Sequence, residues 1–166
     1  MEVIRIFDLR QFDRTSRRFR DVVYRNSAKP PDPSSTPDGR GGFSVFEVAC
    51  ACPGQGVDSD CICCYIARFY PAIAPEPCVY WAFNISIFNP PNPNPNHLPS
   101  PVLVSAPSDT GDPCHRNMHN VSDNRFDKYR RTQTEQDLRI CANGRSEPFT
   151  ANRAIELYKQ YYPDPA

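Results

Sequence analysis

The sequence predicts an α+β fold: one domain in which short, mostly antiparallel strands combine with two or three helices and long proline-rich loops. Three observations lead to this prediction. The length of 166 residues suits a single domain. The apolar runs do not alternate as strand–helix–strand units, which disfavours a parallel α/β sheet. The 19 prolines exceed the ordinary share of about 5% and shorten regular elements. Residues 1–166 are therefore expected to form one domain.

Strands are expected where β-branched and aromatic residues gather. The run at Cys78–Ile87 is the strongest, and in the first run we expect Val3 and Phe7 to share a face with Arg5. The turn Asn143-Gly144 is expected to end the last strand. The predicted strands and short apolar runs are Glu2–Asp8, Arg20–Arg25, Phe43–Val48, Cys78–Ile87, Val102–Ala106 and Leu138–Ala142.

Two helices carry clear start signals. Ser59 or Asp60 can cap a helix that runs to Tyr70, where Pro71 stops it, and its circumference is mostly apolar. Thr150 can cap a final helix to Tyr162, with Ile155 and Tyr158 facing inward. The remaining segments are polar loops rich in proline or glycine, at residues 26–42, 89–101 and 107–124.

Charge and hydropathy narrow the function classes. The 19 basic and 19 acidic residues balance, so no overall field favours a nucleic-acid partner, and we expect none. No stretch approaches the ~20 apolar residues of a membrane span, and the N-terminus lacks the pattern of a signal peptide. We therefore expect a protein of the producing cell's cytoplasm, without a membrane partner. A chain delivered by a signal-independent secretion system would look the same.

The eight cysteines allow three interpretations. In the first, which we favour, those at 61, 63 and 64 are small buried residues on a helix, and Cys78 and Cys141 belong to strand cores. The second is a zinc site formed by Cys50, Cys52, Cys61 and Cys64, with Cys114, His115 or His119 as alternative ligands. The third is a set of disulfides, which requires an oxidising compartment.

One candidate site combines Tyr24-Arg25 with Gly41-Gly42-Phe43-Ser44-Val45-Phe46-Glu47. An arginine fork can grip a diphosphate, and glycines let backbone amides approach an anion. Ser44 can hydrogen-bond a ribose or a carboxamide. The alternative is a structural arginine beside a plain glycine turn.

The same residues resemble the start of small bacterial toxins with an ADP-ribosyltransferase-like fold, those delivered by type VI secretion and, more loosely, the NAD-degrading RES toxins. The resemblance covers about residues 22 to 48. It implies NAD as the substrate, Arg25 and Ser44 as residues that hold it, and a later acidic residue that supports cleavage of the glycosidic bond. Glu47, Glu135 and Glu147 are the candidates for that residue, and Glu47 is our choice.

A second candidate site lies between Asp109 and Asn120, where two histidines, a cysteine and two aspartates gather. His115 or His119 could act as a general base near neutral pH. Cys114 beside His115 could serve as a nucleophile. The alternative is a loop whose Asp and Asn side chains bond to their own backbone.

Together these observations lead to one hypothesis and one rival. The hypothesis is an NAD-consuming toxin or effector, either a transferase or a glycohydrolase, in which Arg25, Ser44 and His115 or His119 line one cleft. A toxin implies an antitoxin or immunity protein as its partner. The rival is a zinc-binding, cysteine-rich interaction module without catalytic activity.

Overall fold

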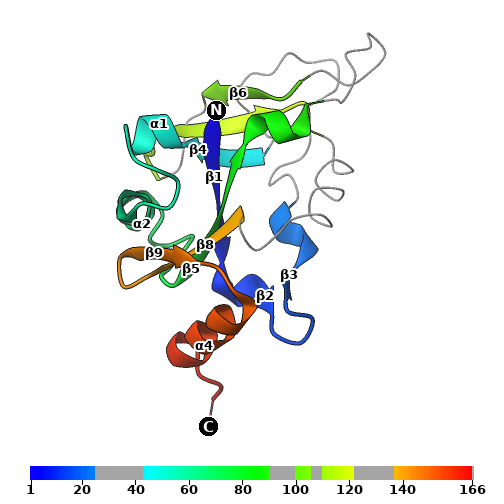
Figure 1. Ribbon diagram of the computed structural model, residues 1–166, viewed down its shortest axis with the longest axis vertical. Coiled ribbons are helices and arrows are strands. Elements are labelled where there is room, and N and C mark those ends of the chain that lie inside the picture. Colours follow the sequence, from blue (N-terminus) through cyan, green and yellow to red (C-terminus); the bar gives the residue numbers. More distant parts are fainter. Residues whose placement is uncertain (25–42, 90–99, 106–109, 122–136, 166) are drawn as a thin grey trace.

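The computed structural model describes residues 1–24, 43–89, 100–105, 110–121 and 137–165. In this part of the chain seven strands form one antiparallel sheet in the order β6-β7-β4-β1-β5-β8-β9, and β2 pairs with β3 alone (Figure 1). The sheet and helices belong to the α+β class that the sequence predicted. The strands are β1 (Glu2–Asp8), β2 (Phe12–Asp13), β3 (Arg18–Phe19), β4 (Phe43–Glu47), β5 (Cys78–Asn84), β6 (Val102–Ser105), β7 (His115–His119), β8 (Leu138–Ala142) and β9 (Arg145–Pro148); the helices are α1 (Val48–Ala51), α2 (Asp60–Phe69) and α4 (Ala151–Tyr161).

Two predicted segments are corrected. The run expected as a strand at Arg20–Arg25 contains a short 3-10 helix at Asp21–Tyr24, in which the Val23 amide donates to the Arg20 carbonyl at 3.2 Å. The loop expected at 107–124 contains β7, which pairs on both sides, with β4 and with β6. The reason lies in the tertiary structure. This polar segment lies between the edges of two other strands and forms backbone hydrogen bonds with both, which its own composition does not predict.

The first face of the sheet carries the larger apolar cluster. Alternation along β1 places Val3 and Phe7 on this face, where Trp81 of β5 lies against Phe43 and Phe83. Helix α4 and the aromatic side chains of β2 and β3 cover the lower part of the face. Arg5 shares the face, as predicted, because its guanidinium lies 4.3 Å from the centre of the Phe43 ring.

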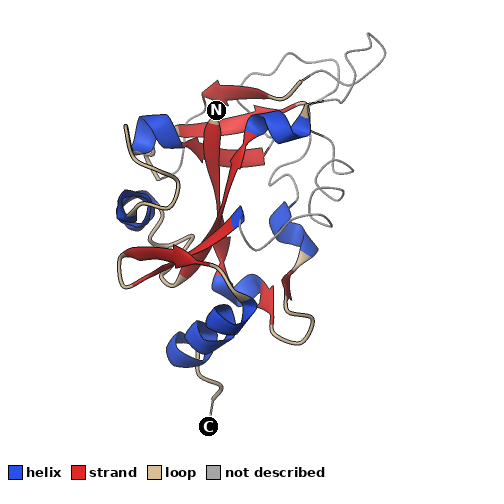
Figure 2. Ribbon diagram, viewed as in Figure 1, coloured by secondary structure: helices blue, strands red, loops and turns tan. Residues whose placement is uncertain are grey.

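The second face is covered by α1 and α2, which lie together on one side of the sheet (Figure 2). Ile4 and Phe46 from the sheet pack against Ile62 and Ile66 of α2. The start of α2 lies where it was predicted, since Ser59 is the residue before its first turn, but the Ser59 side chain makes no capping hydrogen bond. Most of the site described below lies on this second face, and Arg5, whose Nη1 reaches the Ser44 carbonyl of the neighbouring strand β4 at 2.9 Å, also lines its cavity.

Helix α4 begins at the predicted cap but buries a different stripe. The Thr150 side chain accepts a hydrogen bond from the Arg153 amide at 3.1 Å. Its buried residues are Ala151, Ala154 and Leu157, whereas Ile155 and Tyr158 are only partly buried. The sequence pattern failed here because two of the buried residues are alanines, which carry little apolar surface.

The Thr150 cap provides a first prediction. Replacing Thr150 with alanine removes the acceptor at the helix start, and we expect the free energy of unfolding to fall by about 1 kcal/mol in urea titrations. Thr150→Ser keeps the oxygen and should leave stability within about 0.5 kcal/mol of the parent. Equal stability of the alanine and serine variants would contradict a capping role.

Candidate functional site

Three disulfides cross-link the second face: Cys50–Cys114, Cys52–Cys61 and Cys63–Cys141. The favoured interpretation of free core cysteines is therefore wrong for Cys61, Cys63 and Cys141. It holds for Cys78, which is buried and unbridged, and whose burial raises the pKa of its thiol to about 12. Cys64 is also unbridged but exposed. Two of the bridges span 64 and 78 residues, and no local spacing indicates such pairs.

The alternative zinc set is not assembled in this structure. Cys50, Cys52 and Cys61 all form disulfides, whereas zinc binds thiolate sulfur. Within the described ranges no group of three or more His, Cys, Asp or Glu side chains is placed to hold a metal ion. The Cys114 sulfur, considered above as a nucleophile, is likewise bonded to Cys50.

Ser44 and His115, which belong to the two separate candidate sites, are neighbours in the structure. In the ladder of β4 and β7, Ser44 pairs with Asn117 and Phe46 pairs with His115. These side chains therefore lie on the second face. The Ser44 Oγ and His115 Nε2 atoms are 2.6 Å apart, a hydrogen bond in which the histidine tautomer decides the donor. Only 9% of the His115 surface is exposed.

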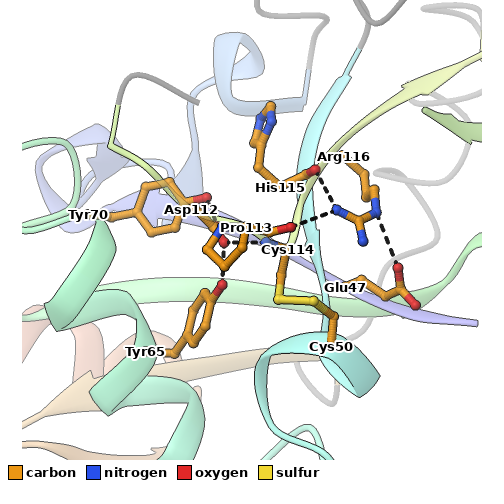
Figure 3. Close-up of a disulfide and its surroundings, with 9 residues drawn as sticks. All are labelled: Glu47, Cys50, Tyr65, Tyr70, Asp112, Pro113, Cys114, His115 and Arg116. Carbon is orange, nitrogen blue, oxygen red and sulfur yellow. Dashed lines mark hydrogen bonds and ion pairs between the residues drawn. A yellow bond between two sulfur atoms is a disulfide. The ribbon is translucent and has the colours of Figure 1, made fainter. Parts of the chain in front are cut away.

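Several contacts hold the start of β7 beside β4 (Figure 3). The Cys50–Cys114 disulfide joins α1 to the residue just before His115. The Glu47 amide donates to the Cys114 carbonyl at 3.1 Å. The Arg116 guanidinium lies 3.3 Å from the Glu47 carboxylate. A covalent bond, a backbone hydrogen bond and an ion pair thus fix the register on which the Ser44–His115 contact depends.

Asp112 anchors the same region from the other side. It is buried and accepts hydrogen bonds from the hydroxyls of Tyr65 and Tyr70 and, at 2.8 Å, from the Cys114 amide (Figure 3). Burial raises the pKa of Tyr65, and its bond to Asp112 adds to that shift. The carboxylate therefore ties the helix that carries Tyr65 to the strand that carries His115.

Ser44 opens onto a cavity of about 110 Å³. An apolar protein cavity of about 150 Å³ can hold a benzene ring. This cavity is smaller but partly open, so it can enclose part of a planar ring. Its walls are mostly apolar. Arg5 contributes a guanidinium group and Ser44 a hydroxyl. The full lining is Ile4, Arg5, Ile6, Ser44, Val45, Phe46, Tyr70 and Ile73.

The other acidic and basic candidates lie elsewhere. Glu47 is three residues beyond Ser44 on the same strand, so it lies on the opposite face, in its ion pair with Arg116. Glu147 pairs with Arg153 on β9 and α4, at 2.9 Å. Glu135, Arg25, Gly41 and Gly42 lie outside the described residues.

Tyr24 and His119 are both buried but are not part of the Ser44–His115 contact. Tyr24 packs edge-on against Phe7 and Trp81 in the first-face cluster, on the opposite side of the sheet. His119 lies on β7 on the same face as His115, four residues further along. Its Nε2 atom is buried and has no hydrogen-bond partner in the described part of the chain.

Sequence reasoning missed Arg5 and Tyr70 as parts of this site, and it included Asp112 among the residues of the second candidate site without giving it a role. Arg5 did carry a signal, because a charged residue stands in the middle of an otherwise apolar strand. Tyr70 carried no signal that distinguishes it from an ordinary helix end, and the sequence did not show that Asp112 accepts from it, since their hydrogen bond joins residues 42 positions apart.

Comparisons of the chain with protein-family models, with curated proteins and with solved structures find no match. Among the described helices none has the length and apolar character needed to cross a membrane. The function is therefore argued from the site itself.

Proposed function

We propose that the chain is a small NAD-binding and NAD-consuming enzyme of ADP-ribosyltransferase-like type, a toxin or effector. The observation that carries the proposal is the 2.6 Å contact between His115 and Ser44, which lines a mostly apolar cavity. Ser44 is also the residue that the resemblance over residues 22 to 48 assigns to NAD. The cavity is mostly apolar and partly open, which supports one side of a nicotinamide ring as its occupant.

The roles follow from the chemistry of the lining. The nicotinamide ring packs against Phe46 and Tyr70, and the Ser44 hydroxyl hydrogen-bonds the adjoining ribose or carboxamide. His115 orients that hydroxyl and accepts a proton from the attacking water or acceptor group. Because Glu47 lies on the other face, we no longer propose it as the supporting carboxylate. Arg25 remains the proposed diphosphate residue, and Glu135, another of the three candidates, takes the place of Glu47 as the proposed acidic residue.

Release of nicotinamide from NAD tests this proposal. We expect Ser44→Ala and His115→Gln each to lower the rate at least about 100-fold, the lower range for losing a positioned acid–base group. Ser105→Ala, on the neighbouring strand β6 and exposed, is the matched control and should retain the parental rate. If the parent protein neither binds NAD nor releases nicotinamide, the proposal fails.

The disulfides bear on where such an enzyme works. Bridges of this kind persist in oxidising compartments, which supports a chain that folds in or passes through one, rather than a permanent cytoplasmic protein. The NAD assay should therefore compare oxidised protein with protein treated with dithiothreitol. If the protein is a toxin with an immunity partner, the oxidised parent protein should arrest the growth of cells that lack that partner. The His115→Gln variant should not arrest their growth.

One further function is favoured by the same contact. A serine hydroxyl at hydrogen-bond distance from a histidine is also the arrangement of a nucleophile and its base. Hydrolysis of p-nitrophenyl acetate, with covalent labelling of Ser44 by a sulfonyl fluoride, would support an acyl hydrolase. Labelling that is absent in the parent protein would remove this candidate.

A further inference from the structure

The Arg5 side chain holds a positive charge that no carboxylate in the described part of the chain neutralises. Its Nη1 donates to the Ser44 carbonyl at 2.9 Å, and its guanidinium lies over the Phe43 ring. Its Nε is buried and has no hydrogen-bond partner among the described residues. A guanidinium carries five N–H donors, and here one backbone oxygen is the acceptor that meets them.

Other partly buried arginines of the described residues show how unusual this is. Arg116, Arg139 and Arg153 each have a carboxylate within 4 Å, from Glu47, Asp58 and Glu147. Arg5 alone among the partly buried described arginines has none. Burial lowers the pKa of Arg5 to about 10, so the side chain remains a cation at neutral pH.

The position of Arg5 indicates what could supply the missing charge. Arg5 lines the cavity of about 110 Å³ together with Ser44, and the other walls are apolar. A cation that is removed from water gains most from an anion that forms charge-assisted hydrogen bonds with it. The apolar walls favour a ligand whose remaining body is flat and apolar.

We propose that this cavity binds a small aromatic carboxylate, with the carboxylate on the Arg5 guanidinium and the ring against Phe46 and Tyr70. The planar fork of arginine matches the two oxygens of a carboxylate. This inference concerns a different ligand class from NAD and does not depend on NAD turnover. If both proposals hold, aromatic carboxylates compete with the nicotinamide ring for the cavity.

Calorimetric titration with benzoate and benzamide tests the charge requirement on the unaltered protein. The two probes share ring and shape and differ in charge. Benzoate should bind saturably, and benzamide at least about tenfold more weakly, because charge-assisted hydrogen bonds exceed neutral ones. No saturable benzoate binding, or equal binding of the two probes, would overturn the proposal.

Variants of Arg5 test the residue. Arg5→Met keeps the apolar stem and removes the fork, so benzoate affinity should fall at least about tenfold while benzamide affinity stays within about twofold. Arg68→Met is the matched control, an exposed arginine that also lies over an aromatic ring, Phe69, and it should bind benzoate like the parent. Parental benzoate affinity in Arg5→Met would contradict the assignment.

The thermal unfolding of Arg5→Met separates binding from folding. Since the variant removes a buried charge that has no counter-charge, its midpoint without ligand should equal or exceed that of the parent. Added benzoate should raise the midpoint of the parent and not that of the variant. A benzoate-induced rise of equal size in both proteins would also overturn the proposal.

Discussion

Removing the Cys63–Cys141 disulfide with the double substitution Cys63→Ala and Cys141→Ala is expected to lower the free energy of unfolding by about 4 kcal/mol. The bridge joins α2 to β8 across 78 residues. In the chain-entropy model a loop of that size restricts the unfolded state by roughly 4 kcal/mol, slightly less when other bridges shorten the path. Both side chains are buried. Alanine keeps the packing of each Cβ atom, so the main loss is the cross-link.

Guanidinium titration of the oxidised proteins measures this effect. The short bridge Cys52–Cys61 spans 9 residues, so its removal should cost less, about 2 to 3 kcal/mol. Cys64→Ala is the control, because Cys64 is exposed and unbridged, and it should stay within about 0.5 kcal/mol of the parent. Equal losses for the long and short bridges would show that chain entropy is not the source of the stabilisation.

Asp112→Ala is expected to lower the free energy of unfolding by about 3 to 5 kcal/mol. The substitution leaves the hydroxyls of Tyr65 and Tyr70 and the amide of Cys114 without their acceptor. A buried donor without a partner costs about 1 to 3 kcal/mol. Because Tyr70 lines the cavity, the affinity of the cavity for the ligands proposed above should fall as well.

The contribution of each donor can be separated. Tyr65→Phe and Tyr70→Phe each remove one phenol and should cost less than Asp112→Ala, about 1 to 2 kcal/mol in the same titrations. Asp58→Ala is the matched control, an exposed aspartate in a loose ion pair with Arg139, expected to change stability by less than about 0.5 kcal/mol. A change this small for Asp112→Ala would refute its anchoring role.

Much of the fold could be predicted from local pattern. The strands at Glu2–Asp8 and Leu138–Ala142 and the turn at Asn143-Gly144 occur where they were expected. The helix starts at Ser59 and Thr150 were also predicted correctly. Strand alternation, turns and helix caps are set by residues a few positions apart, so one sequence contains enough information to predict them.

Part of the candidate site was visible in the same way. Ser44 and His115 were both selected from sequence, but for separate sites, and the hydrogen bond between them joins residues 71 positions apart. Arg5 was assigned correctly to the face of Val3 and Phe7, yet nothing local showed that it would lack a counter-charge. The segment that carries His115 was expected to be a loop. It is a strand because β4 and β6, which are distant in sequence, supply its hydrogen-bond partners.

The sequence by itself therefore determined the α+β class, most strand positions, the two helix starts and the Thr150 cap, because these depend on neighbours along the chain. Only the tertiary structure decided that Ser44 meets His115, that Glu47 points to the other face, and that Arg5 lines a cavity without a carboxylate. It also decided the cysteine pairing, in which Cys63 finds Cys141 across 78 residues. Those features depend on which distant residues the sheet register brings together, and register is a property of the whole packed chain.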